Sequence, residues 1–88
     1  MILARIEGNA ICTIQHESLR GWRLAMCQAI NEADEMTGEP FLALDGLNAG
    51  LHQRVLVTTD GRGIRERVGD AHSPARFMIT CILDEAEA

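Results

Sequence analysis

Apolar and polar residues alternate along several short segments of this chain, which is the pattern of β-strands that bury one face. Residues 2–7 place Ile2, Ala4 and Ile6 at alternate positions, with more polar side chains between them. A Gly-Asn pair follows, and because glycine permits unusual backbone angles we expect a bend or bulge there. Residues 10–14 are apolar again, so the pattern predicts that the strand continues after this break.

Two more strands are predicted in the middle of the chain, at residues 41–44 and 53–59. In the second of them, Val55, Val57 and Thr59 fall on one face. The connection between the two strands carries two glycines and is too polar for a core, and an Asp-Gly pair closes the second strand. Such punctuation is typical of strand boundaries in a small β domain.

The last third of the chain predicts a short helical turn and a final strand. Residues 64–68 are compatible with one helical turn after a glycine-rich bend, and residues 70–74 form a loop that ends in a proline. The strand predicted over residues 75–83 is the clearest in the chain. One face of it carries Phe77, Ile79, Cys81 and Leu83.

Residues 22–36 are compatible with either a helix or a strand. Helix formers are frequent in this segment, and Ser18 is a suitable N-cap. Apolar residues recur at the spacing of a helix face, at Leu19, Trp22, Met26, Ile30 and Ala33. However, Trp22, Leu24 and Met26 also alternate with their neighbours as they would in a strand. The pattern by itself slightly favours the helix.

Five or six short strands in 88 residues predict an all-β fold with a closed or nearly closed barrel. Closure removes the free strand edges that otherwise promote aggregation. A chain of this size forms one domain and buries only about 60–65% of its unfolded surface. Because 47% of its residues are hydrophobic, the apolar surplus either fills the core or is covered by a subunit interface.

The charge and the low aromatic content limit the possible partners. Nucleic-acid binding needs a basic surface, whereas the net charge is −5. The aromatic residues Trp22, Phe41 and Phe77 are too few for a base-stacking platform. Polar residues interrupt the N-terminal apolar run, and no run approaches the roughly 20 apolar residues of a membrane span. We therefore expect a soluble cytoplasmic protein with neither nucleic acid nor membrane as a partner.

The three cysteines, Cys12, Cys27 and Cys81, are odd in number and widely spaced. This arrangement argues against a disulfide framework and suits a reducing cytoplasm. Cys12 and Cys81 each lie in an apolar, strand-like segment. We expect these two thiols to be buried and unreactive.

No set of residues has the spacing of a catalytic, cofactor or metal site. The three histidines, at positions 16, 52 and 72, lack ligand-like spacing, and the aspartates lie at predicted turns or strand ends. Neither Ser18 nor Ser73 lies in a nucleophile turn. The Gly-Arg-Gly at residues 61–63 lacks the lysine and the length of a phosphate-binding loop. We expect no catalytic residue, no cofactor and no metal, and therefore no enzyme.

Three blocks of the chain resemble the EutN/CcmL family, the small shell proteins that close the vertices of bacterial microcompartments. The blocks are MILARIEGN, FLALDGLNAGLHQRVLVTTDG and SPARFMITCILD, and they stand in the family's order and spacing. The resemblance covers residues 1–84 and leaves residues 85–88 as an acidic tail. It implies an OB-like β-barrel subunit that assembles into a ring. It also favours a strand over residues 22–29 and a loop over residues 31–40, which we adopt as the expectation for this segment.

The resemblance further implies a homopentamer that caps the fivefold vertices of a cytoplasmic shell, with hexameric shell proteins as its neighbours. In the family, the segment after the Asp-Gly pair helps to form the central face of the assembly. The corresponding axial or pore loop here contains Asp60, Gly61, Arg62, Gly63 and Arg65. We also expect shell or subunit contacts at Asp45, Asn48, Gly50, Ser73, Pro74 and Arg76. The alternative hypothesis is a small OB-like module that binds a ligand or an oligonucleotide.

Overall fold

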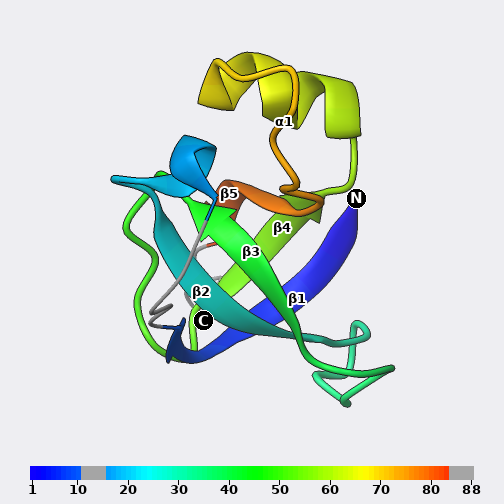
Figure 1. Ribbon diagram of the computed structural model, residues 1–88. Helices are drawn as coiled ribbons and strands as arrows, with labels where there is room; N and C mark the ends of the chain where they lie inside the picture. The colour runs from blue at the N-terminus through cyan, green and yellow to red at the C-terminus, as the bar shows by residue number, and fades with distance from the viewer. Residues whose placement is uncertain (11–15, 84–88) are drawn as a thin grey trace.

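Five strands close into a barrel in the computed structural model of the protein, which describes residues 1–10 and 16–83 (Figure 1). The strands are β1 (Ile2–Ala10), β2 (Arg23–Ala29), β3 (Phe41–Asp45), β4 (Arg54–Thr58) and β5 (Met78–Leu83). Their order around the barrel is β1-β2-β3-β5-β4, and all neighbours are antiparallel except β3 and β5. The predicted all-β barrel is confirmed. The strand predicted over residues 10–14 lies, apart from Ala10, outside the described residues.

Strand β1 buries the face that the alternation of apolar residues predicts. Ala4 and Ile6 are buried inside the barrel, and Ile2 packs against the same core. The register between β1 and β2 shifts between Ile6 and Gly8, so that Glu7 has no partner on β2. This shift is the bulge expected at the Gly-Asn pair. It increases the local twist and helps β1 to pair with β2 on one side and β4 on the other.

Strand β2 confirms the strand that the family resemblance predicts for residues 22–29, and no helix forms here although the apolar spacing slightly favours one. Its backbone pairs with β1 on one side and with β3 on the other. The small side chains of Ala25 and Cys27 are buried inside the barrel, whereas Met26, on the opposite face, is exposed. The interior of a small barrel has little room, so small residues face inward here and larger apolar residues remain on the outer wall.

Strand β5 starts later than the sequence predicts and changes face halfway along. Val57 pairs with Ile79 but Leu56 pairs with Cys81, so Thr80 is an extra residue, and its hydroxyl donates to the Leu56 carbonyl at 3.2 Å. Ile79 is buried in the barrel core, but the bulge places Cys81 on the outside. The prediction of a buried Cys81 is therefore wrong. Cys12 lies outside the described residues.

The segment after β4 is an eight-residue helix, α1 (Gly61–Val68), and not the predicted glycine-rich bend with a single turn. Asp60 is its N-cap residue. Gly69 ends it in a left-handed conformation with φ of 80° and donates its N–H to the Arg65 carbonyl. Such a glycine stops a helix without steric cost, because it has no Cβ.

Helix α1 is held against the outside of the barrel by a second apolar cluster. Ile64, the buried residue of α1, packs there with Leu44 and Met78, which point outward from β3 and β5. Half-buried side chains surround them, including Trp22 and Val68. Burial of Ile64 offsets the cost of two glycines in the first helical turn, which is about 1 kcal/mol each.

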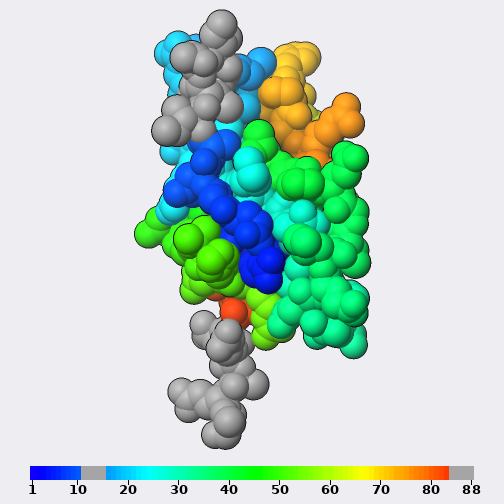
Figure 2. Space-filling view, turned by 90° about the horizontal axis from the view of Figure 1, so that it is seen from below, coloured from blue at the N-terminus to red at the C-terminus, as the bar shows by residue number. Residues whose placement is uncertain are grey.

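The β2–β3 connection, residues 31–40, forms an extended arm at the end of the barrel opposite α1 (Figure 1). All ten residues of this arm are exposed. Figure 2 shows the arm as a continuous band along one edge of the face seen from below. The loop predicted for this segment is therefore confirmed, and it protrudes from one end of the barrel.

Within the described residues, neither α1 nor the short 3-10 helix η1 (Glu17–Leu19) is long and apolar enough to cross a membrane.

Candidate functional site

The outer wall formed by β2 and β3 carries apolar side chains that stay partly exposed. Met26 and Leu42 pair across the two strands and are 42% and 43% exposed. In the next outward pair, Leu44 belongs to the cluster that holds α1 and Leu24 packs against it. Further exposed large apolar residues are Met1, Met36, Leu47 and Leu51. The apolar surplus of the composition is therefore visible on the surface as well as in the core.

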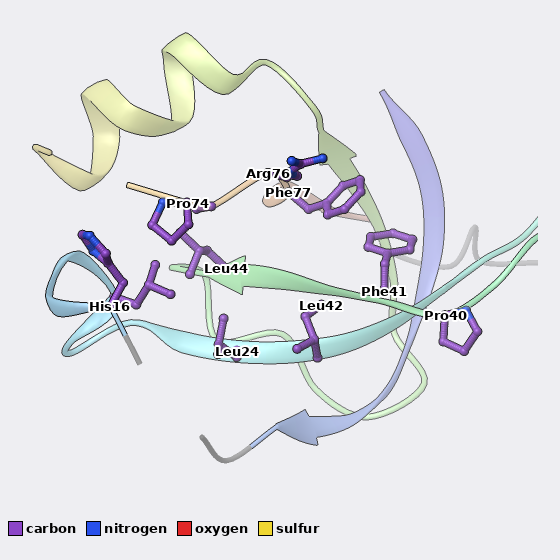
Figure 3. Close-up of a pocket in the computed structure, with 11 residues that line it drawn as sticks. His16, Leu24, Pro40, Phe41, Leu42, Leu44, Pro74, Arg76 and Phe77 are labelled. Atoms are coloured by element: carbon purple, nitrogen blue, oxygen red, sulfur yellow. The ribbon is translucent and has the colours of Figure 1, made fainter. Parts of the chain in front are cut away.

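A groove runs along the outside of the barrel between β3 and the segment that leads into β5. These two parts pair only where Leu44 meets Met78, so they diverge elsewhere and leave a hollow of about 610 Å³. The rings of Phe41 and Phe77 lie in it with centroids 4.6 Å apart and planes tilted by 39°. Figure 3 shows these rings facing each other. We call this hollow the seam groove.

Arginines line one side of the seam groove and its continuation toward α1. Arg76 lines the groove beside Phe77 (Figure 3). A second hollow of about 500 Å³ shares residues 74–77 with it and adds Arg65 and Thr59. No carboxylate of the described residues lines either hollow, and neither arginine forms an ion pair within that part of the chain. The seam groove is thus apolar along its length and positively charged at one side.

The residues predicted to form an axial loop belong to the start of α1. Asp60 is the N-cap, and Gly61, Arg62, Gly63 and Arg65 lie within the helix, so the prediction of a loop is wrong while its position in the assembly stays a prediction. The Arg62 guanidinium lies 3.4 Å from the Glu66 carboxylate, one turn along an exposed face. Arg62 is thus paired with a carboxylate of its own helix.

Asp45 is a buried residue that stabilises a loop, and its part in a shell or subunit contact stays a prediction. It is 4% exposed. One carboxylate oxygen accepts the Leu47 N–H and the other accepts the Ala49 N–H, each at 2.9 Å. Asp45 therefore fixes the turn after β3. In that turn Asn48 is exposed, with φ of 60°, and accepts a hydrogen bond from Arg23.

The other predicted contact residues divide into buried and exposed ones. Ser73 is 7% exposed and accepts a hydrogen bond from the Ser18 hydroxyl at 2.9 Å, which ties the segment before β5 to η1. Pro74 and Arg76 are exposed and line the seam groove, and the Gly50 N–H donates to the Gln53 side chain. The structure thus brings Pro74 and Arg76 together, while Ser73 has an internal role.

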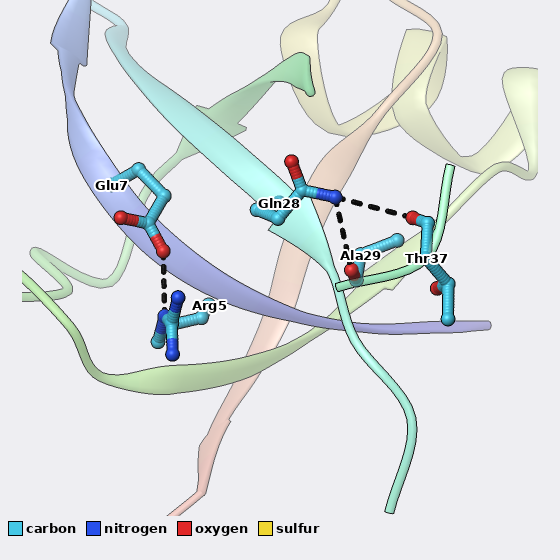
Figure 4. Close-up of polar contacts among 5 residues, drawn as sticks. All are labelled: Arg5, Glu7, Gln28, Ala29 and Thr37. Atoms are coloured by element: carbon cyan, nitrogen blue, oxygen red, sulfur yellow. Dashed lines mark hydrogen bonds and ion pairs between the residues drawn. The ribbon is translucent and has the colours of Figure 1, made fainter. Parts of the chain in front are cut away.

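Gln28 anchors the arm, a role that no sequence pattern indicates. It is 6% exposed, and its side-chain amide donates to the carbonyls of Ala29 and Thr37 (Figure 4). The same amide nitrogen lies 3.1 Å from the Gly38 carbonyl. A glutamine in the outward register of a strand is normally solvated, so the sequence carries no signal that the arm folds over it. On the neighbouring strand β1, Arg5 pairs with Glu7 at 2.5 Å (Figure 4).

The titratable groups of the described residues do not assemble into a reactive site. Burial, and secondarily the carboxylate of Asp45, raise the pKa of Cys27 to about 11, so this thiol stays protonated and is a poor nucleophile at neutral pH. Among residues 1–10 and 16–83, no three His, Cys, Asp or Glu side chains are placed to hold a metal ion.

Comparisons with known proteins agree with the barrel and the motifs. The family described as "Ethanolamine utilisation protein EutN/carboxysome" matches residues 1–84. The microcompartment shell vertex protein EutN of Salmonella typhimurium is 30% identical over 88 residues, covering 100% of this chain and 88% of that protein. The carboxysome shell vertex protein CcmL of Nostoc sp. is 27% identical over 85 residues, covering 96% and 83%.

A solved structure shows the same arrangement of strands. The CcmL of Gloeobacter violaceus superposes with a TM-score of 0.83 at 26% identity, covering 100% of this chain and 90% of that one. The match extends over the whole barrel, in agreement with the family match over residues 1–84. This chain therefore belongs to the EutN/CcmL family.

Proposed function

We propose that five copies of this protein form a ring that fills the fivefold vertices of a polyhedral microcompartment shell in the cytoplasm. The observation that carries the proposal is the likeness, over the whole chain, to proteins named as shell vertex proteins in two kinds of compartment. The protein acts by its shape: a flat lattice of sixfold tiles cannot close on itself, and pentagonal pieces at the corners allow it to close.

The exposed apolar wall supports assembly. A standard interface buries about 800 Å² on each partner. Each member of a ring has two neighbours, so roughly 1,600 Å² of the 5949 Å² surface would be covered. That is more than a quarter of the surface of one chain. Coverage on this scale accounts for apolar side chains such as Met26 and Leu42 on the outside of a small barrel.

The partners of the ring are the hexameric tiles of the shell. We place residues 60–65, which are the N-cap and the first five residues of α1, at the central face of the ring. Five copies of Arg62 would then lie near the axis, each with its own Glu66 at 3.4 Å. This pairing lowers the repulsion between the five guanidinium groups, which water and ions screen further.

Native mass spectrometry tests the ring directly. Five subunits of 9.7 kDa give 5 × 9.7 = 48.5 kDa, and we expect this species at micromolar concentration. A monomer that persists at high micromolar concentration would refute the ring.

The role in the shell needs a test in the host. We expect deletion of the gene to leave the encapsulated enzymes active while the shells become open or elongated. Normal closed polyhedra in a host without another vertex protein would exclude the vertex function.

A further inference from the structure

We propose that the acidic arm of one protomer, residues 31–40, docks into the seam groove of the next protomer. Met36 packs against the apolar floor of the groove, and the carboxylates of the arm face Arg65 and Arg76. This inference rests on the proposed ring and specifies the surface through which its subunits meet.

The first argument is charge. The arm carries four carboxylates and no basic residue: Glu32, Asp34, Glu35 and Glu39. Asp34 lies 3.7 Å from Arg54 of its own chain, and Glu35 accepts a hydrogen bond from the Asn31 side chain at 3.1 Å, so Glu32 and Glu39 remain for a partner. The seam groove and its continuation present Arg65 and Arg76, and no carboxylate of the described residues lines them. Opposite potentials on two separate surfaces favour contact between them and disfavour contact of either surface with its own kind.

The second argument is shape and polarity. Met36 is 69% exposed near the end of the arm, which leaves a large apolar side chain in water. The seam groove has about 610 Å³ of space, walls formed by Leu42 and Pro74, and the paired, tilted rings of Phe41 and Phe77 (Figure 3). Methionine is flexible and polarisable, and it packs well against aromatic rings. The groove is therefore a suitable site for Met36.

The third argument is preorganisation. The Asn31 side chain accepts the N–H groups of Ala33 and Glu35 at 2.9 and 3.0 Å, and Ile30 bridges to Met36. On the far side of the arm, the side-chain amide of Gln28 donates to the Thr37 carbonyl and lies 3.1 Å from the Gly38 carbonyl. An arm with a defined shape in the free chain loses less conformational entropy on docking than a flexible loop.

Because of where the two surfaces lie, the arm is placed to dock into the groove of a neighbouring chain and not into the groove of its own chain. The arm projects from the end of the barrel opposite α1, whereas Arg65 lies on α1 (Figure 1). The seam groove begins at Pro40, the last residue of the arm, and its continuation reaches Arg65 on α1. Each protomer thus offers the rest of its arm at one end and its arginine-lined hollow toward the other. A contact of this kind is head-to-tail, and it closes into a ring when its rotation divides the circle.

Charge reversal tests the contact. The groove variant is Arg65→Glu/Arg76→Glu, and the arm variant is Glu32→Lys/Glu39→Lys. Neither of these glutamates forms a side-chain hydrogen bond or ion pair among the described residues. We expect each variant to weaken ring assembly at least about tenfold, because like charges then face each other. The ring population is measured by native mass spectrometry across a dilution series, with circular dichroism to verify folding.

The combined variant is the decisive measurement. Its charge changes of −4 and +4 cancel, so its net charge equals the −5 of the unmodified chain, and its arm and groove are again complementary. We expect its assembly to return to within about threefold of the unmodified chain. The matched control, Arg20→Glu/Arg67→Glu, also changes the charge by −4 at exposed positions that line neither hollow, and we expect less than about threefold weakening.

Met36→Gln keeps the charge and approximate size and removes the apolar contact, so we expect weakening of several-fold to about tenfold. Reversed variants that assemble like the unmodified chain, or a combined variant no better than either, would overturn the docking of the arm. In both cases a ring formed by the unmodified chain would still support the proposed function. If the unmodified chain forms no ring, both the proposed function and the docking of the arm are refuted.

Discussion

The buried carboxylate of Asp45 is the polar group whose removal should damage the fold most. Its two oxygens accept the N–H groups of Leu47 and Ala49, each at 2.9 Å, and the side chain is 4% exposed. Hydrogen bonds to a charged acceptor contribute about 1.5–3 kcal/mol each. Removing the charge also relieves the cost of burying it, which offsets part of the loss. We therefore expect Asp45→Ala to lower the free energy of unfolding by about 2–4 kcal/mol.

Asp45→Asn refines this prediction. The amide is nearly isosteric, but only its oxygen can accept, so one of the two N–H groups faces an NH₂ donor and loses its partner. We expect a loss of at least about 1.5 kcal/mol even though the volume is unchanged. Asp70→Ala is the control, since Asp70 accepts the His72 N–H at an exposed turn. We expect this variant to lose less than about 1 kcal/mol.

Urea unfolding followed by circular dichroism measures these differences. All variants are compared at one protein concentration, because ring assembly makes the apparent stability concentration-dependent. If Asp45→Asn and Asp45→Ala both unfold within about 0.5 kcal/mol of the unmodified chain, the two hydrogen bonds do not stabilise the fold as reasoned.

Two further predictions concern the barrel core and the helix. The pKa of Cys27 is raised from 9.0 to about 11 in the folded chain. Between pH 9 and pH 11 the thiol therefore ionises only in the unfolded chain, which lowers the free energy of unfolding by up to about 2–3 kcal/mol. Below pH 9 the stability is unaffected. The chain has no lysine or tyrosine to titrate in this window; unfolding followed against pH should show the fall, and Cys27→Ala should remove it. Ile64→Ala should lower the free energy of unfolding by about 2–4 kcal/mol, and the α1 amides should then exchange hydrogen before those of the barrel. Val68 is only half-buried, so Val68→Ala should lower the free energy of unfolding by less. Equal protection of the α1 amides in both variants would contradict this prediction.

The alternation of apolar residues was sufficient to predict most of the barrel. Val55 and Val57 face the core because a strand with period two and one buried face allows no other register. The bulge after Ile6 was foreseeable from the glycine that follows it. These features depend on local geometry, which is encoded within a few residues.

The tertiary structure decided the features that depend on neighbours distant in the sequence. Strand β2 lies between β1 and β3, and the pairing on both sides, with little room inside the barrel, outweighs the helical spacing of its apolar residues. The extra residue Thr80 places Cys81 on the outside of the barrel, and no sequence pattern within β5 predicts this bulge. Helix α1 forms over two glycines because Ile64 reaches an apolar cluster built by Leu44 and Met78.

The candidate assembly surface shows the same division. Composition already indicated an apolar surplus, and the three motif blocks indicated the family. The seam groove, however, exists because β3 and β5 pair only where Leu44 meets Met78, and the arm is held by a glutamine whose partners lie 9 and 10 residues along the chain. Local sequence determines which residues can form strands. Which side chains meet across the barrel, and which surfaces stay uncovered, depends on closure of the whole sheet.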